Sequence, residues 1–160
     1  MQTTDQSGPV RIFRPYQETD KTKVIGVWNR SGLAAYTYLP TWQVMTLETA
    51  AYVFRTIIRP STAIWVGVLD GRVVAYLAMK GSYIDRLYLD PLEWHMGWGR
   101  RFLRLAKELS PAGLELHTHQ ENCPACALYE SEGFLAVKFG ISPPPESAPL
   151  SSTTGGHKFI

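Results

Sequence analysis

The chain has 160 residues, 45% of them hydrophobic and 19% charged, with sixteen Lys and Arg against fourteen Asp and Glu for a net charge of +2. This composition is typical of one globular domain and argues against a disordered or fibrous protein. The charge is small for a nucleic-acid partner, two cysteines cannot form a disulfide scaffold, and no apolar run approaches the ~20 residues that cross a bilayer, so we expect a cytoplasmic protein without a nucleic-acid or membrane partner.

The first part of the chain predicts one strand and two helices after a polar N-terminal extension at residues 1–9. Their ranges are Val10–Phe13, Asp20–Asn29 and Leu47–Ile58. The pair Ser31-Gly32 is expected to end the first helix. Thr46 is placed to cap the second helix, and Pro60 is placed to end it.

The middle of the chain predicts a meander of three strands, Ala63–Leu69, Arg72–Met79 and Tyr83–Leu89. Asp70-Gly71 joins the first two, and an Asp-Gly pair between β-rich runs is a strong hairpin signal. Pro91 ends the third strand.

The remaining elements alternate between helix and strand. They are a helix at Gly97–Leu109, a strand at Leu114–His119, a helix from Pro124 to about Glu132 and a strand at Phe134–Phe139. Their order predicts a mixed sheet with helices packed on it, over residues 10–140. Residues 141–160 are rich in Pro, Ser, Thr and Gly and predict an irregular tail, with at most a short last strand at His157–Ile160.

The stretch Leu87–Gly99, LYLDPLEWHMGWG, joins a strand to a helix through closely spaced glycines. Glycine lets the backbone approach a ligand, and the N–H groups at a helix N-terminus favour a phosphate. Arg100 and Arg101 add positive charge in the first turn, where a helix built for stability alone prefers acids. A tight strand-to-helix connection with Gly for packing explains the same residues, so this motif leaves both readings open.

A second motif follows in Asn122–Phe134, NCPACALYESEGF. Together with Leu89-Asp90-Pro91 and the Gly97-Trp98-Gly99 run, it resembles the GNAT superfamily of N-acetyltransferases, whose pattern continues as N-x-x-A-x-x-x-Y-x-x-x-G-F. The resemblance covers about residues 10–140. It implies a mixed α/β fold whose sheet is mostly antiparallel, with a V-shaped opening between the fourth and fifth strands and helices on both faces.

The resemblance also implies acetyl-CoA as cosubstrate, no metal, and direct transfer of the acetyl group to a primary amine of a small molecule or peptide. A homodimer is compatible with the family. The residues implied for acetyl-CoA binding are Leu87, Tyr88, Leu89, Met96, Gly97, Trp98, Gly99, Arg100, Asn122 and Tyr129. Among these, the Leu89 N–H would bond the thioester carbonyl as an oxyanion donor, and Tyr129 would protonate the departing thiolate.

The chemistry requires a base near the amine, because an alkyl ammonium with a pKa near ~10.4 must lose a proton before it attacks. Strand alternation places Tyr83, Asp85, Leu87 and Leu89 on one face, which makes Asp85 the candidate base. A purely structural ion pair between Asp85 and Arg86 is the alternative to this catalytic role. A chain of water molecules is another candidate for the base. For Tyr129 the alternative to a general acid is a tyrosine that only packs in the core.

The acceptor site is less determined. Four aromatic residues are candidates to line it, although they equally suit the core: Tyr36, Tyr38, Trp42 and Tyr83. Trp94 stands where the family pattern has Gln or Arg, and His95 stands where it commonly has Gly. Side-chain help from position 94 in phosphate binding is therefore lost, whereas backbone N–H binding is not.

Three other readings compete with an acetyltransferase. Cys123-Pro-Ala-Cys126 has the spacing of a thioredoxin-like redox motif, and with His117 and His119 it offers ligands to zinc. The third is an acyl-CoA-binding module of the same fold that has no catalytic activity. Two helix-cap cysteines and two polar residues at a strand end explain the first two patterns without chemistry.

Overall fold

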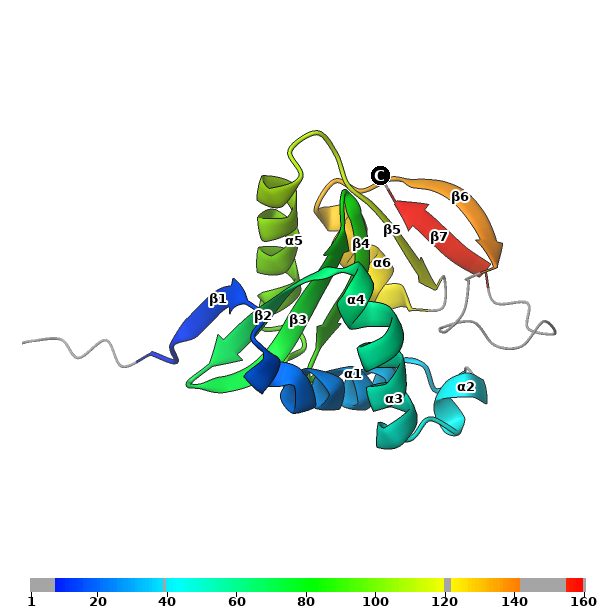
Figure 1. Cartoon of the computed structure of the whole chain (residues 1–160). Coiled ribbons are helices and arrows are strands. Elements are labelled where there is room, and N and C mark those ends of the chain that lie inside the picture. The colour runs from blue at the N-terminus through cyan, green and yellow to red at the C-terminus, as the bar shows by residue number, and fades with distance from the viewer. Residues whose placement is uncertain (1–7, 39, 120–121, 142–154, 160) are drawn as a thin grey trace, which may run out of the picture.

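The computed structural model describes residues 8–38, 40–119, 122–141 and 155–159. Its sheet has seven strands in the order β1-β2-β3-β4-β5-β7-β6, with helices on both faces (Figure 1). The strands are β1 (Arg11–Pro15), β2 (Ala63–Leu69), β3 (Arg72–Lys80), β4 (Tyr83–Leu89), β5 (Glu115–His119), β6 (Ala136–Ile141) and β7 (Gly155–Phe159). All neighbouring strands run antiparallel except β4 and β5, which run parallel. The predicted mixed, mostly antiparallel sheet is confirmed.

The helices are α1 (Lys21–Ala35), α2 (Pro40–Gln43), α3 (Leu47–Val53), α4 (Arg59–Ser61), α5 (Trp98–Leu109) and α6 (Cys123–Ser131). Shorter helical turns are η1 (Glu18–Asp20), η2 (Phe54–Ile58) and η3 (Pro91–Glu93). The structure contains no helix, within the residues it describes, that is both long and apolar enough to span a membrane.

Two apolar cores hold the helices against the sheet. On one face α1, α3 and η2 bury residues such as Val24, Trp28 and Phe54 against β2 and β3. On the other face α5 buries Phe102 and Leu103, together with further residues of β3, β4 and α6. Fully burying side chains of this size stabilises the fold by about 1.5–3 kcal/mol each, so both helical layers are fixed on the sheet.

The hairpin between β2 and β3 forms as predicted. Asp70 and Gly71 have φ angles of 48° and 80°, both in the left-handed region that a two-residue type I′ turn requires. The Asp70 carboxylate also accepts a hydrogen bond from the Val10 N–H at 2.9 Å, which ties the start of β1 to the turn.

Helix α1 is longer than predicted, because Ser31-Gly32 does not end it and the helix runs to Ala35. Gly32 is needed here for close packing, since a Cβ at this position would overlap the ring of Trp42. The glycine therefore marks a contact between α1 and α2 and not a helix end. The extra turn carries Ser31 and Ala35 toward the functional site.

The predicted helix over Leu47–Ile58 begins as expected, with the Thr46 side chain accepting a hydrogen bond from the Thr49 N–H at 3.1 Å. It changes at Phe54 into the π-helical turn η2, and Pro60 lies within the following short α4. The wider turn shifts the buried face, so Ile58 is fully buried while Ile57 is 49% exposed. Ile57 therefore lies outside the core.

The C-terminal strand lies inside the sheet. β7 pairs with β5 on one side and with β6 on the other, so β6 reaches the sheet only through β7 (Figure 1). β6 begins two residues later than predicted, and β7 overlaps the predicted last strand. The other tail residues, 142–154, and the first seven residues of the predicted extension lie outside the described residues.

Candidate active site

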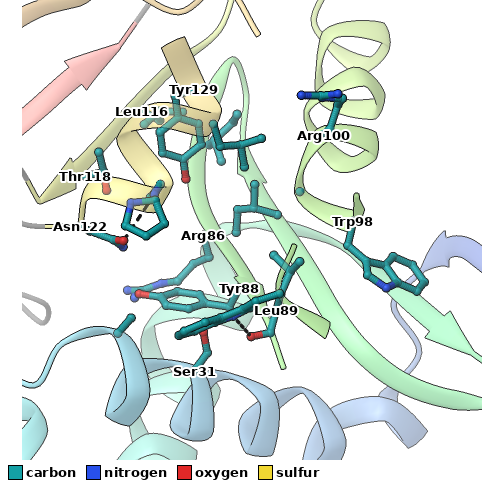
Figure 2. Close-up of a pocket in the computed structure, with 18 of the residues that line it drawn as sticks. Ser31, Arg86, Tyr88, Leu89, Trp98, Arg100, Leu116, Thr118, Asn122 and Tyr129 are labelled. Atoms are coloured by element: carbon teal, nitrogen blue, oxygen red, sulfur yellow. Dashed lines mark hydrogen bonds between the residues drawn. The ribbon is translucent and has the colours of Figure 1, made fainter. Parts of the chain in front are cut away.

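A cavity of about 660 Å³ opens where β4 and β5 separate. The two strands pair only at Tyr83–Glu115 and Ile84–Leu116, and from Leu116 onward β5 pairs with β7. Beyond Ile84, the edge of β4 that faced β5 therefore borders the cavity (Figure 2). Backbone polar groups at such an edge need a partner, and an extended amide-containing ligand would supply one.

The cavity is built from five elements. β4, β5 and α6 line its centre, the N-terminus of α5 lines one end, and the last turns of α1 line the other. Figure 2 shows the Tyr129 hydroxyl pointing from α6 into the space beside β4, the Arg86 side chain extending beside Tyr88, and the Trp98 ring pointing away from Tyr129. The last turn of α1 contributes Ser31, Ala34 and Ala35, which the sequence did not predict for the site because the helix was expected to end before them.

The N-terminus of α5 has the geometry of an anion site. Gly97, its N-cap residue, has a φ of 86° and supplies no capping side chain, so the N–H groups of the first turn face the cavity mouth without a side-chain cap. Gly99 packs against α6, because a Cβ there would lie 2.6 Å from Leu128 Cδ2. His95 has a φ of 62°, a conformation that glycine adopts at lower cost.

The predicted phosphate-binding residues differ in whether they line the cavity. Gly97, Trp98, Gly99 and Arg100 line the cavity, but Met96 does not, and its carbonyl accepts a hydrogen bond from Arg11 at 2.7 Å. The Trp98 ring is fully buried, so this residue presents only its backbone to the cavity.

The arginine at the start of α5 is held by a carboxylate. Arg100 Nε lies 2.8 Å from Glu132 Oε1, and Arg104 and Lys107 also approach Glu132 at 3.9 and 3.6 Å. These contacts tie α5 to the end of α6, so much of the local positive charge is compensated within the protein.

Trp94, which replaces the family's Gln or Arg, is one of the residues that line the cavity. Its indole Nε1 donates to the Leu89 carbonyl at 3.0 Å. The substitution therefore places an aromatic wall beside the end of β4 and occupies the Leu89 carbonyl.

Tyr129 and Asn122 both lie on the cavity wall. Tyr129 is 7% exposed and its ring packs on Phe134, and burial raises the pKa of its phenol well above the usual range. The phenol therefore keeps its proton at neutral pH. Asn122 is the N-cap of α6, where its Oδ1 accepts from the Ala125 N–H at 3.4 Å.

Asp85 lies in a bulge of β4 that the sequence did not predict. The register shifts at this point, so that Met79 pairs with Ile84 and Ala78 pairs with Arg86, leaving Asp85 as the extra residue. Ile84 then packs in the same core as Leu87 and Leu89, while Tyr83 turns to His117. The predicted single face of Tyr83, Asp85, Leu87 and Leu89 is therefore wrong.

Asp85 still lines the cavity, and its carboxylate forms an ion pair with Arg86, Nε to Oδ2 at 3.3 Å. Arg86 is 4% exposed, and its guanidinium stacks on the Trp28 ring with the Cζ atom 5.1 Å from the ring centre. The ion pair weighed as the alternative for Asp85 is thus present in the structure.

The four predicted acceptor-site aromatics lie in different surroundings. Tyr36 lines the cavity and stacks on Trp42, whose own ring is 2% exposed in the core. Tyr38 packs against the same core. Tyr83 is not among the lining residues, but its hydroxyl lies 2.7 Å from Nδ1 of His117, which does line the cavity.

The structure also describes the residues of the competing redox and zinc motifs. Cys123 is exposed and Cys126 half-buried at the start of α6, and both are thiols. The part of the chain that the structure describes holds no group of three or more His, Cys, Asp or Glu side chains arranged for a metal, although the His119 side chain lies outside the described residues.

Comparisons with known proteins agree with this architecture. The model of the family described as "Acetyltransferase (GNAT) family" matches residues 31–134, more than half of the chain. The peptidyl-lysine N-acetyltransferase YjaB of Salmonella typhimurium is 29% identical over 123 residues, covering 76% of this chain and 81% of that protein.

Two solved structures show the same fold. The solution structure of apo YjaB from Escherichia coli superposes with a TM-score of 0.74 at 19% identity, covering 94% of this chain and 96% of the other. The structure of yncA from Salmonella typhimurium with acetyl-CoA has a TM-score of 0.69 at 11% identity and covers 93% of this chain and 91% of that one.

Proposed function

Because this chain belongs to the GNAT family of acetyltransferases and is therefore an acyltransferase, we propose that it moves the acetyl group of acetyl-CoA to a primary amine by direct transfer in a ternary complex. The observation that carries this proposal is the continuous cavity from the N-terminus of α5, along the β4 edge, to Tyr129. Acetyl-CoA is a substrate here, and it supplies an acyl group already activated as a thioester.

The chain's own groups suit the parts of this ligand. The first-turn N–H groups at Gly97 to Arg100 suit its pyrophosphate, and the β4 edge at Leu87 and Leu89 suits the amides of its pantetheine arm. The Leu89 N–H is the proposed oxyanion donor, and Asn122 is the proposed side-chain contact to pantetheine.

Tyr129 is the proposed general acid. Its hydroxyl faces the cavity from α6, and its raised pKa keeps the proton available for the sulfur of the departing thiolate. No covalent intermediate on the protein is required, since the amine attacks the thioester directly.

For the acceptor, we propose the ε-amine of a lysine side chain in a peptide or protein. The relatives YjaB of Salmonella typhimurium and YjaB of Escherichia coli are peptidyl-lysine N-acetyltransferases. The carboxylate of Asp85 lines the cavity, and an acid at this position attracts an ammonium group.

The test has two stages. Calorimetry is expected to show acetyl-CoA binding, and an assay of CoA release is expected to show turnover with an N-blocked peptide that carries one lysine. The same peptide with its lysine already acetylated is the matched control and is expected to give no CoA above background.

The outcomes separate the proposals. Absence of acetyl-CoA binding overturns the function as a whole. Binding without CoA release from any member of a panel of peptide and small-molecule amines identifies a binding module instead. Turnover with small amines but not with peptides contradicts only the proposed acceptor.

A further inference from the structure

The bulge in β4 leaves the reaction without the base that strand alternation suggested. Asp85 is the extra residue of the bulge, and its carboxylate is 3.3 Å from the Arg86 guanidinium. This carboxylate already has a cation of the protein as its partner. Another group at this end of the cavity is better matched to an ammonium ion.

His117 on β5 is such a group. It lines the cavity opposite β4, at the first strand residue after the β4–β5 pairing ends at Leu116. His117 is exposed to solvent, so protons can pass between its ring and water. An unperturbed imidazole has a pKa of about 6.5, close to neutral pH, whereas a carboxylate at about 3.9 is a much weaker base.

The ring of His117 is oriented by Tyr83. The phenol oxygen lies 2.7 Å from Nδ1, and the two ring centres are 5.4 Å apart. Burial and, to a smaller extent, the nearby acids raise the pKa of Tyr83 to about 12, so the phenol stays neutral. A hydrogen bond to one ring nitrogen determines which nitrogen of the neutral imidazole carries the proton and which carries the lone pair.

We propose that His117 is the general base of the acetyl transfer, and that Tyr83 is its positioning residue. This inference rests on the proposed function. The proposal requires the tautomer in which Nδ1–H of His117 donates to the Tyr83 oxygen and Nε2 accepts a proton from the substrate ammonium. The imidazole contacts Tyr83 of β4, whose phenol in turn feels the charges of Asp85, Arg86 and Glu115, and Lys158 of β7 is the backbone register partner of His117.

The proton balance of the step is complete. Nε2 removes one proton from the ammonium, and the neutral amine forms a C–N bond with the thioester carbon. The C–S bond then breaks and Tyr129 transfers its phenol proton to sulfur. The second amine proton restores the Tyr129 phenol through water, and the His117 imidazolium releases its proton to solvent. One amide, one CoA thiol and one solvent proton result.

The test is the pH dependence of kcat/KM for His117→Gln, measured with the amine that gives most CoA release in the panel above. In the wild-type chain kcat/KM is expected to rise with pH as the imidazole loses its proton, because the deprotonated imidazole is the active form. His117→Gln is expected to lack this rise of kcat/KM with pH, here called the pH limb. Its kcat/KM near neutral pH is expected to be lower by about 100-fold or more. Its affinity for acetyl-CoA by calorimetry is expected to be unchanged, which shows that the variant is folded.

Three further variants sharpen the result. Tyr83→Phe is expected to lower kcat while keeping the limb, because the imidazole remains but loses its anchor. Asp85→Asn is expected to keep the limb, and loss of the limb in this variant alone assigns the base to Asp85 instead. Glu108→Gln, an exposed position on α5, is the control and is expected to match the wild type.

The failure of this proposal differs from the failure of the proposed function. A wild-type chain that turns over while His117→Gln keeps both rate and pH limb contradicts His117 as base and leaves the acetyltransferase intact. A wild-type chain without turnover on any amine contradicts both.

Discussion

Tyr129 is buried and also lines the cavity, and both properties bear on its proposed role as general acid. A buried phenol without its proton is costly, so the raised pKa is the direct result of the position of α6 over the β4–β5 opening. The same burial that suits a packing residue therefore also suits an acid that must remain protonated until the thiolate departs.

Replacing Tyr129 by Phe separates these two roles. The ring packing against Phe134 is retained, so the free energy of unfolding and the acetyl-CoA affinity are expected to change little. If the phenol proton is used, kcat falls by about 100-fold or more. Steady-state kinetics of CoA release measure this, and a Tyr129→Phe enzyme with wild-type kcat shows that the residue only packs.

The wild-type pH profile gives a second measure of Tyr129. An acid is active only in its protonated form, so its contribution is lost as pH rises through its pKa. Because that pKa is raised, no alkaline fall in kcat from this group is expected up to about pH 10, the ordinary tyrosine value.

At the scale of elements, a buried ion pair connects β1 to α1. Arg14 bonds both oxygens of Asp20, at 2.8 and 2.9 Å, and the Gln17 N–H donates to the same carboxylate at 2.9 Å. The Asp20 side chain is 4% exposed. The Arg14 guanidinium is the main cause that lowers the pKa of Asp20.

Asp20→Asn is expected to lower the free energy of unfolding at neutral pH by about 1.5–3 kcal/mol, the range for hydrogen bonds to charged groups. Since the folded-state pKa is lowered, this stabilisation is present above the unfolded value of about 3.9 and is lost as pH falls through the folded pKa. Urea unfolding at neutral and acidic pH measures the difference between the two proteins, which should shrink in acid.

A nearby pair provides the matched control. Glu18 and Arg59 form an ion pair at 2.9 Å, but their side chains are 67% and 43% exposed. Glu18→Gln is therefore expected to leave the unfolding curve nearly unchanged. Equal effects of the two substitutions would show that the burial of Asp20 contributes nothing.

Elements with strong local signals were predictable, and those shaped by packing were not. Asp70-Gly71 and Thr46 act through their own backbone and side-chain chemistry, so the hairpin and the start of α3 are correct. Gly32 was misread because the ring that it accommodates belongs to Trp42, in another helix. The π-helical turn and the Asp85 bulge likewise depend on neighbours that no local pattern reveals.

The site shows the same division. The turn at Gly97 and the N-cap at Asn122 are local features that the motifs contain, and both line the cavity. The contributions of Ser31 and His117 depend on the length of α1 and on the point where β5 leaves β4. Those two features belong to the assembled sheet and helices.

For the whole molecule, β7 is expected to determine whether the sheet is complete. It is paired on both sides, so its removal exposes the edges of β5 and β6 together. A chain lacking residues 155–160 is expected to unfold at lower urea concentration and to associate through these edges. Urea unfolding and size-exclusion chromatography measure both effects, and a monomeric truncated chain with the wild-type midpoint contradicts the prediction.

The placement of β7 also sets an order on synthesis at the ribosome. Every other described strand leaves the ribosome before β7, yet β6 has no described strand neighbour until β7 lies beside it. The nascent chain can therefore form the β1–β4 meander early, while β6 must wait for residues 155–159 to emerge. We expect the part of the sheet beyond β5 to form only after this segment has emerged, because β7 is the strand that joins β6 to β5.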